Sequence, residues 1–151
     1  MNIFFTSRDP IEAAQYSCDK HVVKMSLETA QMLCTVAAEN GHKDPCLYKP
    51  VHQKHPCTLW AGKNVANWAW LCRHGIALCQ EYTFRYDKRH KCEDVIRTIY
   101  RNRLGPQGIV WLTGMTPLPQ AMPDKYKNSD PVKAYRDYYI GEKNGFARWS
   151  R

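Results

Sequence analysis

The sequence lacks a long hydrophobic run, and no stretch of its 151 residues is apolar enough to span a bilayer. The first ten residues lack the basic and hydrophobic regions of a signal peptide. Internal repeats and low-complexity tracts are missing too. We therefore expect a cytoplasmic protein without membrane contact, folded as a single domain over residues 1–151. With 44% hydrophobic residues, the chain can bury a real core.

Paired CxxC motifs are absent, although seven residues are cysteines. Their odd number and irregular spacing argue against a complete disulfide framework, so we expect reduced thiols, several of them buried in helices. Cys18 and His21, with His52, His55 and Cys57, have spacings that would suit a zinc site. The alternative is that His55 caps the helix that follows it. We expect no metal and no other cofactor.

Acidic residues are few, with 14 Asp and Glu against 22 Lys and Arg, which gives a net charge of +8. A basic surface gains free energy by releasing counterions from phosphates, so this balance favours a polyanionic partner. Aromatic and basic residues alternate from Tyr82 to Lys91, a pattern that suits a phosphate-lined groove with a stacking surface. The alternative for this run is a solvated charged surface.

Helix signals cover most of the chain and predict a mainly α-helical fold with long ordered loops. Asp9–Pro10 and Asp130–Pro131 each combine a capping residue with proline at the first helical position. Prolines between Leu104 and Lys127 indicate an extended, ordered loop over the core. The predicted helices run from Pro10 to about Tyr16, from a cap at Asp19 to near Asn40, from about Thr58 toward Arg85 as a buried central helix, from about Glu93 to Asn102, and onward from Pro131.

Three ionisable residues share one face of the second predicted helix. At about 100° per residue, His21, Lys24 and Glu28 fall within roughly 60° of each other, and Gln31 and Thr35 extend that side. The opposite side, which we expect to be apolar and buried, consists of Val23, Leu27, Ala30, Cys34 and Ala37. A histidine between a lysine and a carboxylate indicates a site. A solvated helix face with an accidental histidine is the alternative.

These residues also carry a family resemblance. Asp19-Lys20-His21, followed by Glu28 seven residues after the histidine, resembles the Asp-Gln-His and later Glu of pyrimidine-dimer DNA glycosylases of the phage endonuclease V type. The resemblance continues along most of the chain in order, at His55, Trp60, Leu78 and Glu81, at Glu142-Lys143, and at Trp149. It implies an endonuclease V-like fold, which is a compact helical domain with long ordered loops.

The resemblance implies a mechanism in which the amino group at the start of the chain attacks C1′ of a damaged nucleotide, forms an imine and then breaks the strand by elimination. An α-amino group suits this role because its pKa is about 8. The matching group is the amine of Met1, or of Asn2 if Met1 is removed. Glu28 matches the catalytic glutamate, and His21 matches a histidine that orients it or binds a phosphate. Lys24 is an alternative imine-forming amine, or else a phosphate contact.

The chain departs from the family pattern at both ends of this site. The family begins with a small residue and then an arginine, whereas this chain has Asn2 and Ile3. Arginines that flank the family glutamate are replaced by Leu27 and Gln31. Trp149 either stacks on a base or anchors the last helix. The residues that we expect to contact DNA are Arg8, Lys20, Gln31, Lys54, His55, Arg85, Lys88, Arg89, Lys91 and Trp149.

The resemblance therefore predicts a monomeric DNA N-glycosylase, with or without AP-lyase activity, that acts on a damaged or modified pyrimidine in double-stranded DNA. If the chain is phage-encoded, its compartment is the host cytoplasm. One alternative is a non-catalytic DNA-binding protein on the same scaffold, and another is an enzyme that acts on a free nucleotide or modified nucleoside. The salt dependence of binding distinguishes the enzyme that acts on a free nucleotide from the two DNA-binding possibilities. Only binding to a polymer weakens steeply with ionic strength.

Overall fold

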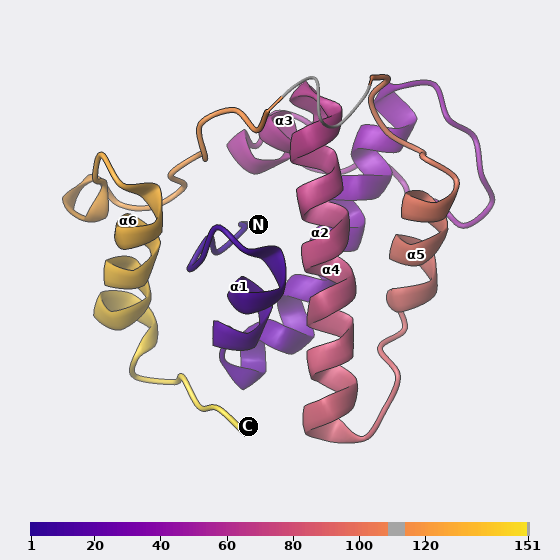
Figure 1. The fold of residues 1–151 in the computed structure, drawn as a ribbon. Helices are drawn as coiled ribbons and strands as arrows, with labels where there is room; N and C mark the ends of the chain where they lie inside the picture. Colours follow the sequence, from indigo (N-terminus) through magenta and orange to yellow (C-terminus); the bar gives the residue numbers. More distant parts are fainter. Residues whose placement is uncertain (109–113, 151) are drawn as a thin grey trace.

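A computed structural model describes residues 1–108 and 114–150, and within these ranges the chain forms helices and no strands. This confirms the predicted mainly α-helical fold. The elements in chain order are α1 (Pro10–Tyr16), α2 (Asp19–Glu39), α3 (Pro56–Lys63), α4 (Val65–Tyr86), α5 (Glu93–Arg101), a 3₁₀ turn η2 (Asp124–Tyr126), α6 (Pro131–Tyr138) and a π-helical segment η3 (Tyr139–Lys143) (Figure 1).

The starts of α1 and α6 follow the sequence signals. The Asp9 carboxylate accepts hydrogen bonds from the backbone N–H groups of Ile11 and Glu12, and Pro10 occupies the first turn. At α2, by contrast, the predicted cap was wrong. Cys18 is the N-cap and contributes no side-chain hydrogen bond, while Asp19 is the first helical residue and uses its carboxylate elsewhere.

The predicted central helix from Thr58 toward Arg85 is in fact two helices. Asn64 interrupts it with extended backbone angles, φ −155° and ψ 171°. Its side chain accepts a hydrogen bond from the N–H of Asn67 and so caps α4. Tertiary packing turns the chain here, which periodicity alone did not reveal, although Asn is a favoured capping residue.

The core lies where the two longest helices, α2 and α4, pack against each other, with α1, α3 and α5 around them. The N-terminal segment runs between these helices and α6. Phe5 is fully buried and contacts the rings of Trp60, Trp70 and Tyr135, which belong to α3, α4 and α6. This segment therefore carries the start of the chain into the interior and connects α6 to the rest.

The solvent-facing side of α2 differs from the prediction. Val23 and Leu27, expected on a buried side, are 40% and 43% exposed, whereas Ala30, Cys34 and Ala37 are fully buried as expected. The helix is covered from several directions along its second half, so a single two-sided pattern does not describe its whole length. The exposed residues leave two apolar side chains on the surface beside Lys24.

The remaining segments are irregular. In the predicted loop from Leu104 to Lys127, the described parts contain only η2, and residues 109–113 lie outside the described ranges. None of the described helices is long and apolar enough to cross a membrane.

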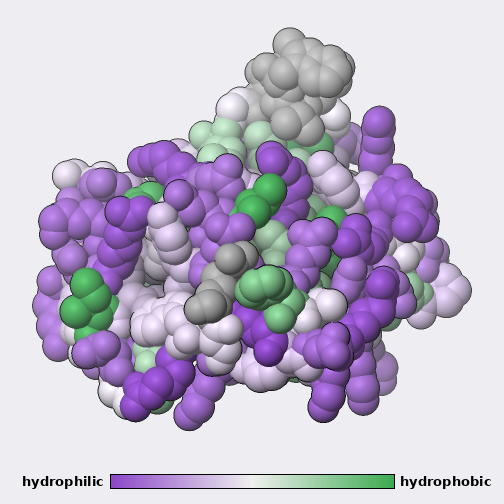
Figure 2. All heavy atoms as spheres, turned by 60° about the horizontal axis from the view of Figure 1, so that its bottom comes forward, coloured by the Kyte–Doolittle hydropathy of each residue, from purple (hydrophilic) through white to green (hydrophobic). Residues whose placement is uncertain are grey.

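All seven cysteines are free, and six of them are buried. One face of the surface is mostly hydrophilic with scattered apolar side chains (Figure 2).

Candidate active site

Glu28, on α2, lies beside the amino group of Met1. Its side chain is only 11% exposed, and its Oε2 atom is 3.8 Å from the Met1 nitrogen. The same oxygen accepts a hydrogen bond of 3.1 Å from the backbone N–H of Asn2. The structure thus brings the start of the chain to Glu28, which is 26 residues from Asn2 in sequence. A carboxylate in this position can receive a proton from the amine or return one to a reacting group.

The start of the chain is held in place by buried contacts. The side-chain amide of Asn2 donates to the carbonyl of Ala121 at 2.8 Å, and its oxygen accepts from the N–H of Ile3 at 2.7 Å. The side chain of Met1 is only 2% exposed, and its sulfur lies 3.8 Å from the Thr58 hydroxyl. The contacts of Met1 and Asn2 therefore hold the amine in position. This lowers the entropic cost of bringing the amine to a substrate.

Lys24 lies one helical turn before Glu28 on the same side of α2. Its ammonium group is 3.7 Å from Glu28 Oε1, and its side chain is 67% exposed. The two carboxylate oxygens therefore face different cations, the Met1 amine at Oε2 and Lys24 at Oε1. Lys24 is accessible to a phosphate while remaining in contact with the carboxylate.

His21 lies on the same face but makes no hydrogen bond with Glu28 in the described part of the chain. Its Nδ1 atom is 2.7 Å from the hydroxyl of Tyr139, and the ring of Phe4 stacks on the imidazole at 4.4 Å. Burial, with smaller contributions from the charges of Lys143 and Lys24, lowers the pKa of His21 to about 4. The imidazole is therefore neutral at physiological pH.

The candidate zinc ligands do not assemble into a metal site. Within residues 1–108 and 114–150, no three His, Cys, Asp or Glu side chains form a group that could hold a metal ion. His55 instead caps α3, because its Nδ1 accepts a hydrogen bond from the N–H of Cys57. Burial lowers the pKa of His55, and the neighbouring Met1 amine lowers it further. The helix-cap alternative for His55 is thus the one that the structure shows.

Arg85, which we expected to contact DNA, points into the structure. Its side chain is completely buried, and the guanidinium binds Asp19 and Glu81 as well as the carbonyls of Ser17 and Gln15. Four hydrogen bonds to these acceptors hold the guanidinium inside the protein, where burial keeps it from solvent. Arg85 joins the start of α2 to the last turns of α4.

The other expected DNA contacts are distributed over the surface. Trp149 is 48% exposed, and its indole N–H donates to the carbonyl of Tyr16 at 2.9 Å. It therefore anchors the C-terminal segment while leaving part of its ring open. Gln31 is partly buried. Exposed side chains belong to Arg8, Lys20, Lys54, Lys88, Arg89 and Lys91, of which Arg89 pairs with Asp94.

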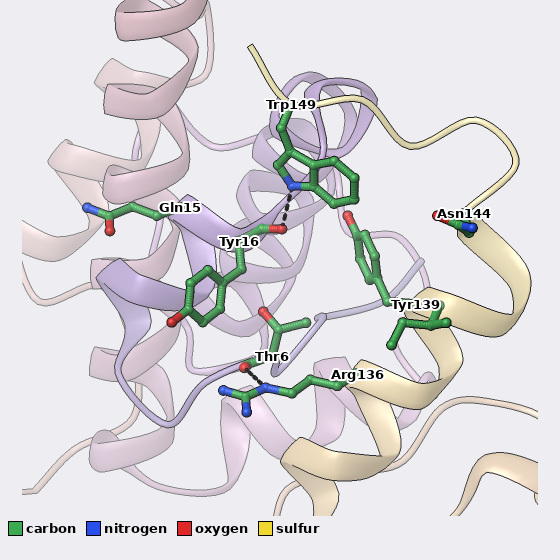
Figure 3. A pocket seen from close by; sticks show the side chains of 8 residues that line it. Thr6, Gln15, Tyr16, Arg136, Tyr139, Asn144 and Trp149 are labelled. Atoms are coloured by element: carbon green, nitrogen blue, oxygen red, sulfur yellow. Dashed lines mark hydrogen bonds between the residues drawn. The ribbon is translucent and has the colours of Figure 1, made fainter. Parts of the chain in front are cut away.

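A pocket of about 390 Å³ opens between α1 and the α6–η3 segment (Figure 3). Tyr16, Tyr139, Ile140 and Trp149 make its lining largely apolar, and Arg136 is fixed beside it by a hydrogen bond to the Thr6 carbonyl. Neither Glu28 nor Met1 lines it. Tyr139 connects this pocket with the candidate active site. It lines the pocket, and its hydroxyl contacts His21.

Sequence reasoning missed the role of Tyr139 and of the Asn2 side chain. Nothing in the spacing of Tyr139 indicated a partner 118 residues away. Asn2 was considered as an alternative source of the attacking amine, and no role was expected for its side chain. Both act through long-range contacts, for which the sequence carries no local signal.

Comparison with known proteins adds one match. A family model described as pyrimidine dimer DNA glycosylase matches residues 1–94. This range contains Met1, His21, Lys24 and Glu28, while Tyr139 lies outside it. No curated protein and no solved structure matches the chain.

Proposed function

The chain belongs to the pyrimidine dimer DNA glycosylase family, and on this basis we propose that it cleaves the N-glycosidic bond of a damaged or modified pyrimidine with the Met1 amine and Glu28. The observation that carries this proposal is the 3.8 Å separation between Glu28 Oε2 and the Met1 nitrogen at a largely buried position. Double-stranded DNA is the proposed substrate, and the exposed lysines and arginines supply backbone contacts.

In the proposed reaction, the uncharged Met1 amine attacks C1′ and a bond forms between nitrogen and carbon. The bond from C1′ to the base breaks, and the departing base takes up a proton. Opening of the sugar ring gives an imine between Met1 and C1′. Glu28 accepts the proton that the amine loses and stabilises the cationic character at the sugar.

The AP-lyase step follows from the same imine. Loss of a proton from C2′ expels the 3′ phosphate and breaks the strand. Water then hydrolyses the imine and regenerates the amine. The carboxylate of Glu28 forms an ion pair with the Met1 nitrogen. Glu28 is therefore our candidate for moving the C2′ proton.

Borohydride trapping tests the proposal. We expect reduction in the presence of a duplex that contains an abasic site or a cyclobutane pyrimidine dimer to join protein and DNA covalently. Peptide mass mapping should place the adduct on the amine of Met1, or of Asn2 if Met1 is removed. A Lys24→Ala variant should still be trapped, whereas an adduct on Lys24 would contradict the assignment of the nucleophile.

A Glu28→Gln variant separates catalysis from binding. It should lower the single-turnover rate by about 10²- to 10⁴-fold and leave duplex affinity equal or stronger, because it removes a negative charge. Absence of a trapped species with every such duplex, together with tight DNA binding, would overturn the enzymatic proposal. That result would instead support a DNA-binding protein on the same scaffold.

A further inference from the structure

The hydroxyl of Tyr139 lies between two groups of the N-terminal half of the chain. It accepts a hydrogen bond of 2.9 Å from the backbone N–H of Cys18 and is 2.7 Å from Nδ1 of His21. The Cys18 thiol is also within hydrogen-bond reach of this hydroxyl. A hydroxyl has one proton to donate, and an imidazole nitrogen is a much better acceptor than a thiol. The proton therefore goes to Nδ1, which leaves the ring proton of His21 on Nε2.

The imidazole is held rigidly in this orientation. Phe4 stacks on one face at 4.4 Å with an interplanar angle of 21°, and the edges of Tyr139 and Phe146 approach at 5.2 and 5.7 Å. Only 6% of His21 is exposed. Ring rotation would lose both the stacking and the hydrogen bond, so the direction of Nε2 is fixed by the packing.

The Nε2 atom of His21 is not fully buried. Among the described residues, Trp68 Nε1 is the only fully buried side-chain nitrogen or oxygen without a hydrogen-bond partner. His21 Nε2 has no hydrogen-bond partner in residues 1–108 and 114–150, and therefore it must reach solvent. A side chain that is nine-tenths buried thus presents one open N–H donor.

Three lysines bring positive charge to the neighbourhood of His21. The charges of Lys143, on η3, and Lys24, on α2, both act on His21, and Lys20 lies over the ring of Phe146 at 5.3 Å. Lys143 makes no ion pair within the described part of the chain and lies 5.0 Å from the Tyr138 ring centroid. An N–H donor close to positive charges is an arrangement that can bind a phosphate diester.

We propose that Tyr139 is a positioning residue that holds His21 as the Nε2–H tautomer, so that this donor, with Lys24 and Lys143, binds a DNA phosphate beside the Glu28 site. This inference rests on the proposed function, since it takes DNA as the ligand. His21 then acts as a fixed hydrogen-bond donor and not as a general base. Phosphate held here would place the sugar of a neighbouring nucleotide toward the Met1 amine.

Nitrogen-15 NMR on the free protein tests the tautomer without DNA or turnover. We expect the His21 ring at neutral pH to show a protonated Nε2 and an unprotonated Nδ1. In Tyr139→Phe the two tautomers should mix, because Nδ1 loses its donor. Tyr138→Phe is the matched control, since its hydroxyl has no hydrogen-bond partner in the described chain, and it should keep the wild-type pattern. A proton on Nδ1 in the wild type would overturn the proposal.

Two substitutions of His21 test the phosphate contact. The amide nitrogen of Gln can occupy the position of Nε2, whereas that of Asn reaches only the position of Nδ1. Binding to a duplex with a stable abasic-site analogue should therefore weaken less than threefold in His21→Gln and about tenfold in His21→Asn. Equal losses in both variants would contradict the donor role.

Salt dependence identifies the cations. Lys143→Ala should reduce the slope of log affinity against log salt by about one, while His21→Asn should leave it unchanged because its donor carries no charge. An unchanged slope in Lys143→Ala would remove Lys143 from the phosphate site. These binding and NMR readouts need no catalysis, so the tautomer and phosphate assignments can fail while imine trapping succeeds, and the reverse.

Discussion

The guanidinium of Arg85 shows how a residue in a basic run can serve stability and not binding. It is enclosed by Asp19 and Glu81, at 3.0 Å each, and by two backbone carbonyls. The run Arg85–Lys91 is basic in sequence, but its first member points into the structure. The carboxylates of Asp19, at the start of α2, and of Glu81, in the last turns of α4, need this cation. Burial of either carboxylate without a nearby positive charge is costly.

Arg85→Ala should therefore lower the free energy of unfolding by about 3–5 kcal/mol, which is typical when one partner of a buried ion pair is removed. Urea denaturation followed by circular dichroism measures the change. Lys88→Ala, at an exposed position in the same run, should stay within about 0.5 kcal/mol of the wild type. If Arg85→Ala kept full stability and instead lost DNA affinity, the structural role of Arg85 would be refuted.

At the same scale, Glu28 could be named from the sequence as a candidate site residue. Its helix periodicity and its spacing from His21 are both local properties. It could not predict that Asn2 donates its N–H to this carboxylate, since the contact depends on how the N-terminal segment packs. The role of His21 changed for a similar reason. Its partner is Tyr139 and not Glu28, and that pairing arises only when η3 folds back onto α2.

Among the elements, α2, α4 and α5 approach closely at Gly75. A methyl group at this position would lie 2.7 Å from Cγ2 of Thr29 and 3.1 Å from Cδ1 of Ile96. These distances are too short for carbon atoms, so glycine allows the three helices to pack at this point. Gly62, in α3, is different, because an added methyl group would meet only Val36, at 3.5 Å.

The two glycines give a matched pair of substitutions to alanine. Gly75→Ala should lower the free energy of unfolding by about 1–3 kcal/mol, since overpacking exceeds the gain in helix propensity. Gly62→Ala should raise it by about 0.5–1 kcal/mol through propensity alone. Thermal and urea unfolding of both variants measures the difference. A stabilised Gly75→Ala variant would show that the helices separate more easily than their packing indicates.

The break between α3 and α4 marks the limit of sequence prediction at this scale. Apolar residues at helical spacing continue from Trp60 to Tyr82, so periodicity predicted one helix. Asn64 carried the missing signal as a capping residue, and its amide also donates to the carbonyl of Gly114. Helix identities were therefore predictable from local patterns, whereas this turn is stabilised by a contact 50 residues away.

The whole molecule is assembled around its own N-terminus. Residues Ile3–Phe5 lie between α6 and the central helices, with Phe5 fully buried, and this places the Met1 amine at Glu28 (Figure 1). The family match ends at residue 94, yet the contacts of Asn2 with Ala121 and of His21 with Tyr139 come from the chain beyond it. The C-terminal third therefore completes the candidate site.

Two buried histidines make the stability of the whole molecule depend on pH. Burial lowers the pKa of both His21 and His74 from 6.5 to about 4, and a hydrogen bond from His74 to the carbonyl of Pro10 opposes this only in part. Between pH 6.5 and pH 4 the unfolded chain binds more protons at these residues than the folded chain does. The free energy of unfolding should therefore fall by about 3 kcal/mol per histidine as the pH drops through this range.

His74→Asn tests this dependence, because the Asn amide retains a donor near Nδ1 but does not titrate. The variant should be less stable at neutral pH, since it leaves a cavity, yet its loss of stability between pH 6.5 and pH 4 should be about half that of the wild type. His52→Asn provides the control. His52 is exposed and has a φ of 50°, which Asn tolerates, so the wild-type pH dependence should persist. Urea titrations at several pH values measure all three proteins, and an unchanged slope in His74→Asn would mean that His74 does not contribute to the acid instability.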